Sequence, residues 1–119
     1  MKKIKVAFLY DFDKTLCDRD MQEYSFIPNL GMTPQEFWGQ TGVIAEECGM
    51  ERILSYMYLM VKLSREKNIP LTKEYLNKCG EGIKLYKGVD TWFDRINKIG
   101  EELGIEIEHY VLSSGTTEI

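Results

Sequence analysis

Residues 4–16 read IKVAFLYDFDKTL, and this stretch decides the fold class that we predict. Residues 4–10 form a nearly continuous apolar run that is rich in strand-forming side chains and bounded by charged residues. Such a run is typical of a strand that is buried on both faces of a parallel sheet. We therefore predict a strand over residues 4–10, followed by a polar segment over residues 11–20.

A second strand is expected over residues 105–112, directly after an amphipathic helix that Gly88 precedes and Gly104 ends. We expect Trp92 and Phe93 to pack this helix on the sheet. Two strands joined through helices imply a parallel pair with a right-handed connection, so the predicted fold class is α/β. The apolar residues of the helix recur at helical spacing, at Val89, Trp92, Phe93, Ile96, Ile99 and Leu103.

Three further helices are predicted between the strands. The first covers residues 34–48, with Thr33 as its N-cap, a proline at its first position and Gly49 as its stop. The second covers residues 50–67 and the third residues 73–79. The apolar stripe expected on the second helix consists of Ile53, Leu54, Met57, Met60, Val61 and Ser64.

This helical block is far longer than a crossover between two strands needs. We therefore predict an inserted helical subdomain over residues 20–86 and a strand-containing core over residues 1–19 and 87–119. Residues 113–118 are expected to form the end of the second strand and the start of another helix.

The composition limits the possible partners and compartments. The 119 residues carry a net charge of −4, so no basic surplus exists to bind nucleic acid through its phosphates. The sequence has three cysteines, an odd number, and no C-x-x-C pair. This pattern favours reduced thiols over a disulfide framework or a zinc ribbon. The apolar run in MKKIKVAFLY is too short for a signal peptide or a membrane helix. We expect a cytoplasmic protein that does not interact with membranes.

Asp11 and Asp13 follow the first strand, at the carboxyl end where open parallel sheets bind ligands. In an extended segment, a spacing of two residues points both side chains to one side. Close carboxylates repel, so the pair raises a pKa or recruits a cation such as Mg²⁺, which prefers oxygen ligands. One carboxylate can attack a phosphoryl group while the other transfers protons, and Thr15 can bind the phosphate or fix the loop. The alternative is a polar loop whose acids only cap a turn.

Ser113, Ser114 and Gly115 follow the second strand and form the second candidate site. A hydroxyl group beside a glycine and a helix N-terminus suits an anion, because free backbone N–H groups point at it. A Ser-Gly turn is common, so the value of this feature comes from its position at the same sheet edge as Asp11.

An apolar strand, then D-x-D-x-T-L, a helical insertion and a second apolar strand ending in serine resembles the haloacid dehalogenase (HAD) superfamily. The likeness is greatest to its phosphatases with a helical cap after the first motif. It covers the whole chain as an order of elements, but only residues 11–16 are specific by sequence. The resemblance implies an incomplete HAD-like Rossmannoid parallel sheet with an inserted α-helical cap.

The resemblance also implies roles for individual residues. Asp11 would be the nucleophile, with one carboxylate oxygen on Mg²⁺, and Asp13 the general acid and base, with its backbone carbonyl on Mg²⁺. Ser113 would bind phosphate with the help of nearby backbone N–H groups. Family members that cleave carbon–halogen bonds lack the second aspartate, so Asp13 favours phosphate esters. The implied function is a Mg²⁺-dependent phosphomonoesterase that acts on a small phosphorylated metabolite through an aspartyl-phosphate.

The chain also departs from the family pattern, which continues with a phosphate-binding Lys or Arg and an acidic pair that completes the Mg²⁺ site. Neither follows Ser113 here, because the sequence ends at Ile119. We therefore expect the N-terminal part of a larger protein, or a natural truncation, with little or no activity alone. The first strand would keep a bare edge, through which the chain would self-associate or bind a partner.

Two other functions are open on the sequence. A non-catalytic HAD-like interaction or regulatory module predicts stable folding without phosphatase activity. A phospho-accepting receiver domain fits the length, but it needs an acceptor aspartate after a third strand and lacks a long helical insertion. His109 is expected to be a surface or hydrogen-bonded residue and not a ligand. A cap of this size suits a phosphorylated amino acid, sugar or nucleotide alike.

Overall fold

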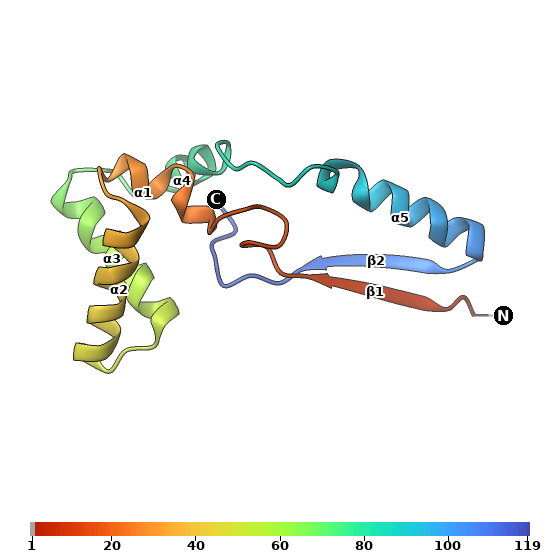
Figure 1. Ribbon diagram of the computed structural model, residues 1–119, viewed down its shortest axis with the longest axis horizontal. Helices are drawn as coiled ribbons and strands as arrows, with labels where there is room; N and C mark the ends of the chain where they lie inside the picture. The colour runs from red at the N-terminus through yellow and green to blue at the C-terminus, as the bar shows by residue number, and fades with distance from the viewer. Residues whose placement is uncertain (1) are drawn as a thin grey trace. The chain divides into compact units, whose positions relative to one another are not determined.

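The computed structural model describes residues 2–119, which form a mixed α/β fold with a two-stranded parallel sheet and five α-helices (Figure 1). Among the described residues, each helix is too short or too polar to cross a lipid bilayer. The elements in chain order are β1 Lys5–Tyr10, the 3-10 helix η1 Met21–Glu23, α1 Phe26–Asn29, α2 Pro34–Cys48, α3 Arg52–Glu66, α4 Lys73–Gly80, α5 Val89–Leu103 and β2 Glu106–Val111.

The chain divides into two compact units. The strand unit consists of Met1–Asp20 and Lys84–Ser113, and the helical unit consists of Met21–Ile83 and Ser114–Ile119. Compactness alone assigns no function to either unit, so the division into a catalytic core over residues 1–19 and 87–119 and a cap over residues 20–86 stays a prediction.

In the strand unit, β1 and β2 pair in parallel, as the order strand, helices, strand predicts. The register runs from Lys5 opposite Glu106 to Tyr10 opposite Val111. The backbone N–H of Leu112 extends the ladder by donating to the Tyr10 carbonyl at 2.8 Å. The carboxyl ends of both strands therefore lie at the same edge of the sheet.

Helix α5 covers one face of this sheet, and Figure 1 shows it running along the strand pair. The Phe93 ring meets the Tyr10 ring edge-on at 5.4 Å, and the Trp92 indole N–H donates to the Tyr10 hydroxyl at 2.9 Å. Gly100 allows the close approach of helix and strand, since a Cβ atom there would lie 2.7 Å from the Ile107 side chain. The prediction that Trp92 and Phe93 pack α5 on the sheet is confirmed.

The prediction that the first strand is buried on both faces is wrong. Leu9 is 64% exposed, and Lys5 forms ion pairs on the sheet surface with Glu106 and Glu108 at 3.5 and 3.8 Å. Burial of both faces requires a packed layer on each side of a sheet. Within residues 2–119, β1 pairs with β2 alone and α5 supplies the packed layer on one face.

Helix α2 of the helical unit begins and ends where the sequence predicts. The Thr33 hydroxyl accepts from the Glu36 backbone N–H at 3.2 Å, and the Glu36 carboxylate accepts from the Thr33 backbone N–H at 2.8 Å. This capping box satisfies two backbone donors that the first turn would otherwise leave without partners. At the other end, Gly49 takes a left-handed conformation with φ of 59°, which glycine adopts without steric cost.

Replacing Thr33 with alanine is expected to lower the free energy of unfolding by about 1 kcal/mol, because one reciprocal bond of the capping box is lost. The measurement is the midpoint of urea-induced unfolding followed by circular dichroism. Gln35→Ala is the matched control, since Gln35 is exposed in the same turn and takes no part in the cap. Equal midpoints for the two variants would contradict this role of Thr33.

The buried face of α3 differs from the predicted stripe. Met60 and Ser64 are buried as predicted, whereas Leu54 is 56% exposed. Because apolar side chains surround this helix, their spacing alone does not choose a face, and packing against α2 decides it. The buried residues of α3 are Ser55, Tyr56, Leu59, Met60, Leu63 and Ser64, and the exposed apolar ones include Ile53, Leu54, Met57, Tyr58 and Val61.

The prediction that residues 113–118 begin a helix is also wrong. The Tyr56 hydroxyl donates to the Ser114 carbonyl at 2.6 Å, and Ile119 packs against the buried core of the helical unit. A Cβ atom on Gly80 would lie 2.8 Å from the Ile119 backbone, so this glycine makes room for the segment.

Candidate functional site

The candidate site begins at Asp11, the first residue after β1. Its side chain is exposed, and each carboxylate oxygen accepts a local hydrogen bond. One oxygen accepts from the Phe12 backbone N–H at 3.0 Å, and the other accepts from the Thr15 hydroxyl at 3.4 Å. A carboxylate oxygen has two lone pairs, so both oxygens can accept a further ligand. The carboxylate is therefore oriented at the end of the strand and remains open to solvent.

A tight turn brings Thr15 back to Asp11. The backbone N–H groups of Thr15 and Leu16 donate to the Phe12 carbonyl at 3.1 and 3.0 Å. Lys14 takes a left-handed conformation with φ of 61°, which is uncommon for a residue with a side chain. The candidate site depends on this turn. Thr15 is four residues after Asp11 in the chain, and the turn brings its hydroxyl back to the Asp11 carboxylate.

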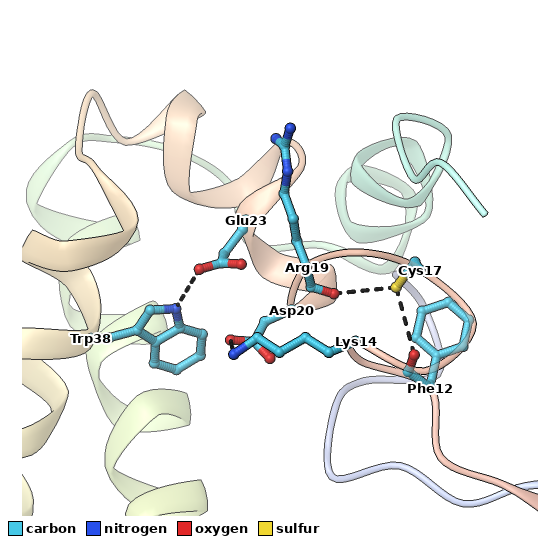
Figure 2. A network of polar contacts seen from close by, with 7 residues as sticks. All are labelled: Phe12, Lys14, Cys17, Arg19, Asp20, Glu23 and Trp38. Atoms are coloured by element: carbon cyan, nitrogen blue, oxygen red, sulfur yellow. Dashed lines mark hydrogen bonds and ion pairs between the residues drawn. The ribbon is translucent and has the colours of Figure 1, made fainter. Parts of the chain in front are cut away.

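The rest of the loop is fixed by the contacts drawn in Figure 2. The buried Cys17 thiol lies 3.6 Å from the Phe12 carbonyl and 3.2 Å from the Arg19 carbonyl, where it donates a weak hydrogen bond. Lys14 pairs with Asp20 at 3.4 Å. In the helical unit, the same figure shows the Trp38 indole N–H donating to the Glu23 carboxylate at 3.1 Å. The buried Cys17 thiol thus contacts the backbone at both ends of the loop, at Phe12 and at Arg19.

Asp13 is half-buried and begins the turn that contains Lys14 and Thr15. The extended spacing that we assumed for the pair therefore does not describe it, because the backbone leaves the strand direction after Phe12. Asp11 and Asp13 belong to one short loop at the carboxyl end of β1, which is where the sequence analysis expects them.

Ser113 lies at the corresponding end of β2. The bond from the Leu112 N–H to the Tyr10 carbonyl places the residues that follow Val111 beside those that follow Tyr10. Asp11 and Ser113 are thus at one sheet edge within the strand unit. Ser114 and Gly115 belong to the helical unit, and no helix begins there to direct a dipole at an anion.

The oxygen donors of Asp11 and Asp13 are the candidate ligands for a metal ion. Within residues 2–119, no three His, Cys, Asp or Glu side chains form a group that could hold a metal ion. Asp11 and Asp13 supply oxygen donors, and Mg²⁺ is commonly held by one or two carboxylates together with water and substrate phosphate. These two residues fit Mg²⁺ in ligand type and in number.

A hydrogen-bond network beneath the site was not predicted. The Tyr10 hydroxyl accepts from the Trp92 indole N–H and lies 2.8 Å from His109 Nδ1, while His109 Nε2 lies 2.7 Å from the Asn97 side-chain oxygen. An indole nitrogen only donates and an amide oxygen only accepts, so the network runs from Trp92 to Asn97 with the His109 proton on Nε2. His109 is hydrogen-bonded, as expected. Tyr10 is the residue before Asp11, and the network therefore anchors the strand end that carries the site.

The cysteines are free thiols, as the sequence predicts. Cys17 and Cys79 are buried and Cys48 is exposed. Burial raises the pKa of the Cys79 thiol above its ordinary value, which disfavours the reactive thiolate. Cys79 is therefore a poor candidate for a nucleophile.

Comparison with protein-family models, curated proteins and solved structures finds no match to this chain.

Proposed function

We propose that the chain is the catalytic segment of a HAD-like hydrolase, a Mg²⁺-dependent phosphomonoesterase that forms an aspartyl-phosphate on Asp11. The observation that carries the proposal is the Asp11 carboxylate, exposed at the carboxyl end of β1 and oriented by Phe12 and Thr15. Asp11 follows the end of β1, and β1 pairs in parallel with β2, which ends at Val111, two residues before Ser113. In this proposal, β1 and β2 belong to an incomplete Rossmannoid sheet, α5 packs on that sheet, and the helical unit is the cap.

The reaction begins with attack of one Asp11 carboxylate oxygen on phosphorus. The bond between phosphorus and the ester oxygen breaks, and the protonated Asp13 carboxyl gives its proton to the leaving alcohol. The Asp13 carboxylate then takes a proton from water, whose oxygen attacks the phosphorus of the acyl phosphate. This second step releases inorganic phosphate, restores the Asp11 carboxylate and leaves Asp13 protonated for the next turnover.

The other roles in this proposal are to bind the metal ion and the phosphate and to orient the nucleophile. Asp11 and Asp13 would hold Mg²⁺, which when bound neutralises charge on the transferring phosphoryl group. The Ser113 hydroxyl donates to a phosphate oxygen, and Thr15 keeps the nucleophile oriented. We place the reaction in the cytoplasm on a small phosphorylated metabolite, consistent with free thiols.

The test is hydrolysis of 4-nitrophenyl phosphate in the presence of Mg²⁺ by the unmodified protein and by Asp11→Asn. Loss of the rate in the variant supports the nucleophile, and an unchanged rate rejects it.

A second candidate function is a non-catalytic interaction module, and the exposed apolar residues of the sheet favour it. Ile4 is 69% exposed, Leu9 is 64% exposed and Leu112 is 60% exposed. Large apolar side chains beside an unpaired strand edge attract another chain. This function predicts a stable fold and binding without phosphate ester hydrolysis.

Self-association follows from the same surface. We expect the protein to form dimers or larger species at concentrations of tens of micromolar, measured by size-exclusion chromatography with light scattering. Leu9→Lys is expected to shift the distribution toward monomer, because it places a charge on the exposed face of β1. The control is Val43→Lys, which adds a charge at a site 51% exposed on α2. A clean monomer for the unmodified protein would contradict self-association.

A further inference from the structure

The strand unit contains an open recess that the proposed reaction does not use. Its volume is about 340 Å³, and its lining combines apolar, aromatic and basic residues. It lies where the end of β1 and the following loop meet the first turns of α5. The lining residues are Tyr10, Leu16, Lys87, Gly88, Val89, Trp92 and Arg95.

The charges of the recess are positive. Lys87 and Arg95 are its only titratable side chains apart from Tyr10, and no acid lines it. Within residues 2–119, neither Lys87 nor Arg95 forms an ion pair with a carboxylate. Two cations without a counter-charge in a concave surface attract an anion.

Arg95 is already held in position. Its guanidinium lies over the Trp92 ring, 5.8 Å from the ring centre, and one of its nitrogens donates to the Gly88 carbonyl at 3.3 Å. A guanidinium group has five N–H donors, so others stay available to a ligand. Because the side chain is immobilised before binding, less conformational entropy is lost when a ligand arrives.

The two aromatic side chains of the recess, Trp92 and Tyr10, are also held in position by hydrogen bonds. The Trp92 indole N–H donates to Tyr10, whose hydroxyl also contacts His109, so neither ring turns freely. Leu16 and Val89 add apolar surface to the lining. The recess therefore suits a ligand that combines a flat, apolar ring with a negatively charged group.

We propose that this recess is a binding site for a small aromatic anion, a planar ring that bears a carboxylate or a phosphate group. The anionic group is held by Lys87 and Arg95, and the ring lies against Trp92, Tyr10 and Leu16. The site is independent of the proposed phosphatase reaction, because Lys87 and Arg95, which bind the anionic group, have no role in that reaction. It therefore binds its ligand without Mg²⁺ and in the Asp11→Asn variant.

The experiment is a titration of the ¹⁵N-labelled protein by NMR without Mg²⁺, with the two tryptophan indole N–H signals as reporters. Trp92 lines the recess, and Trp38 of the helical unit is the internal reference; a Trp38→Phe sample assigns the signals. Benzoate and phenylphosphonate are the probes, and their comparison distinguishes a carboxylate ligand from a phosphate ligand. Acetate supplies the charge without the ring, and benzyl alcohol supplies the ring without the charge.

We expect at least one aromatic anion to shift the Trp92 signal to saturation while the Trp38 signal stays in place. Acetate and benzyl alcohol should each bind at least about 10-fold more weakly, because each lacks one of the two features. Lys87→Gln and Arg95→Ala should each weaken binding by about 3–10-fold, since both charges are partly screened by solvent. Lys98→Ala, which removes a charge from the same helix outside the recess, should leave binding unchanged.

Several results would overturn the proposal. They are equal shifts of both indole signals, acetate binding as tightly as benzoate, no saturable shift with either aromatic anion, or the same affinity in Lys87→Gln as in the unmodified protein. The amide spectrum of Lys87→Gln reports its fold independently, since Lys87 is exposed and its replacement removes no packing.

Discussion

Asp11→Asn is expected to reduce Mg²⁺-dependent hydrolysis of 4-nitrophenyl phosphate by more than about 10³-fold, to the background of the buffer. An amide oxygen is a far weaker nucleophile than a carboxylate and brings no charge to a metal ion. Asparagine preserves the shape of the side chain: its single oxygen can still accept from the Phe12 N–H, and its amide group can donate to the Thr15 hydroxyl, so the local structure is retained. Asp13→Asn should lower the rate by about 10²–10⁴-fold, the usual contribution of a general acid or base.

Asp18→Asn is the matched control for both variants. Asp18 is an exposed acid in the same polar segment, and it pairs with the exposed Arg19 at 3.7 Å. Its replacement should change the rate by less than about 2-fold, because exposed ion pairs contribute little. A rate in Asp11→Asn that falls no further than the rate in Asp18→Asn would contradict the nucleophile assignment.

Turnover by this chain is expected to be slow, since a Mg²⁺ ion held by one carboxylate, one backbone carbonyl and water would be bound weakly. Metal binding therefore provides a second readout. With Mn²⁺ in place of Mg²⁺, the amide signals of Asp11 and Thr15 should broaden in the unmodified protein and stay sharp in Asp11→Asn. Absence of both hydrolysis and broadening in the unmodified protein would reject the phosphatase proposal in favour of the interaction module.

Phe37→Ala is expected to have the largest effect on stability, a loss of about 3–5 kcal/mol in the free energy of unfolding. Phe37 is completely buried and meets the rings of Phe26 and Trp38 edge-on at 6.4 and 5.0 Å. Its removal leaves a cavity in the core of the helical unit. Because small proteins are stable by only about 5–15 kcal/mol, the variant should lie close to its unfolding transition.

Urea-induced unfolding followed by Trp38 fluorescence measures this effect, since the Trp38 ring contacts Phe37 directly. Val43→Ala is the control on the same helix, because Val43 is 51% exposed and its truncation opens no cavity. The control should change the free energy of unfolding by less than about 0.5 kcal/mol. A Phe37→Ala midpoint equal to that of the control would show that this core does not stabilise the unit.

The helix boundaries were predictable because local chemistry sets them. Thr33 and Glu36 close a capping box within four residues, and Gly49 and Gly104 take the left-handed conformation that ends a helix. Each of these signals acts through bonds between near neighbours in the chain, so no distant contact is needed to interpret it.

The position of the candidate site was predictable for a related reason. The end of a parallel strand is a defined place in the fold, and a strand followed by Asp11, Asp13 and Thr15 locates the loop there. The side-chain geometry was not predictable. The turn at Lys14 that returns Thr15 to Asp11, and the network that joins Tyr10 to Trp92 and His109, depend on backbone conformation and on α5.

The sequence by itself determined the order of the two strands and the four longer helices, the ends of α2 and α5, the parallel pairing and the acids at the end of β1, but it did not indicate η1 or α1. Only the tertiary structure decided which side chains are buried. Leu54 is as apolar as Leu59, which is buried on the same helix, and Leu9 lies in an apolar strand, yet both Leu54 and Leu9 are exposed. Burial depends on whether a second layer covers a given face, and that layer comes from parts of the chain that the local pattern does not contain.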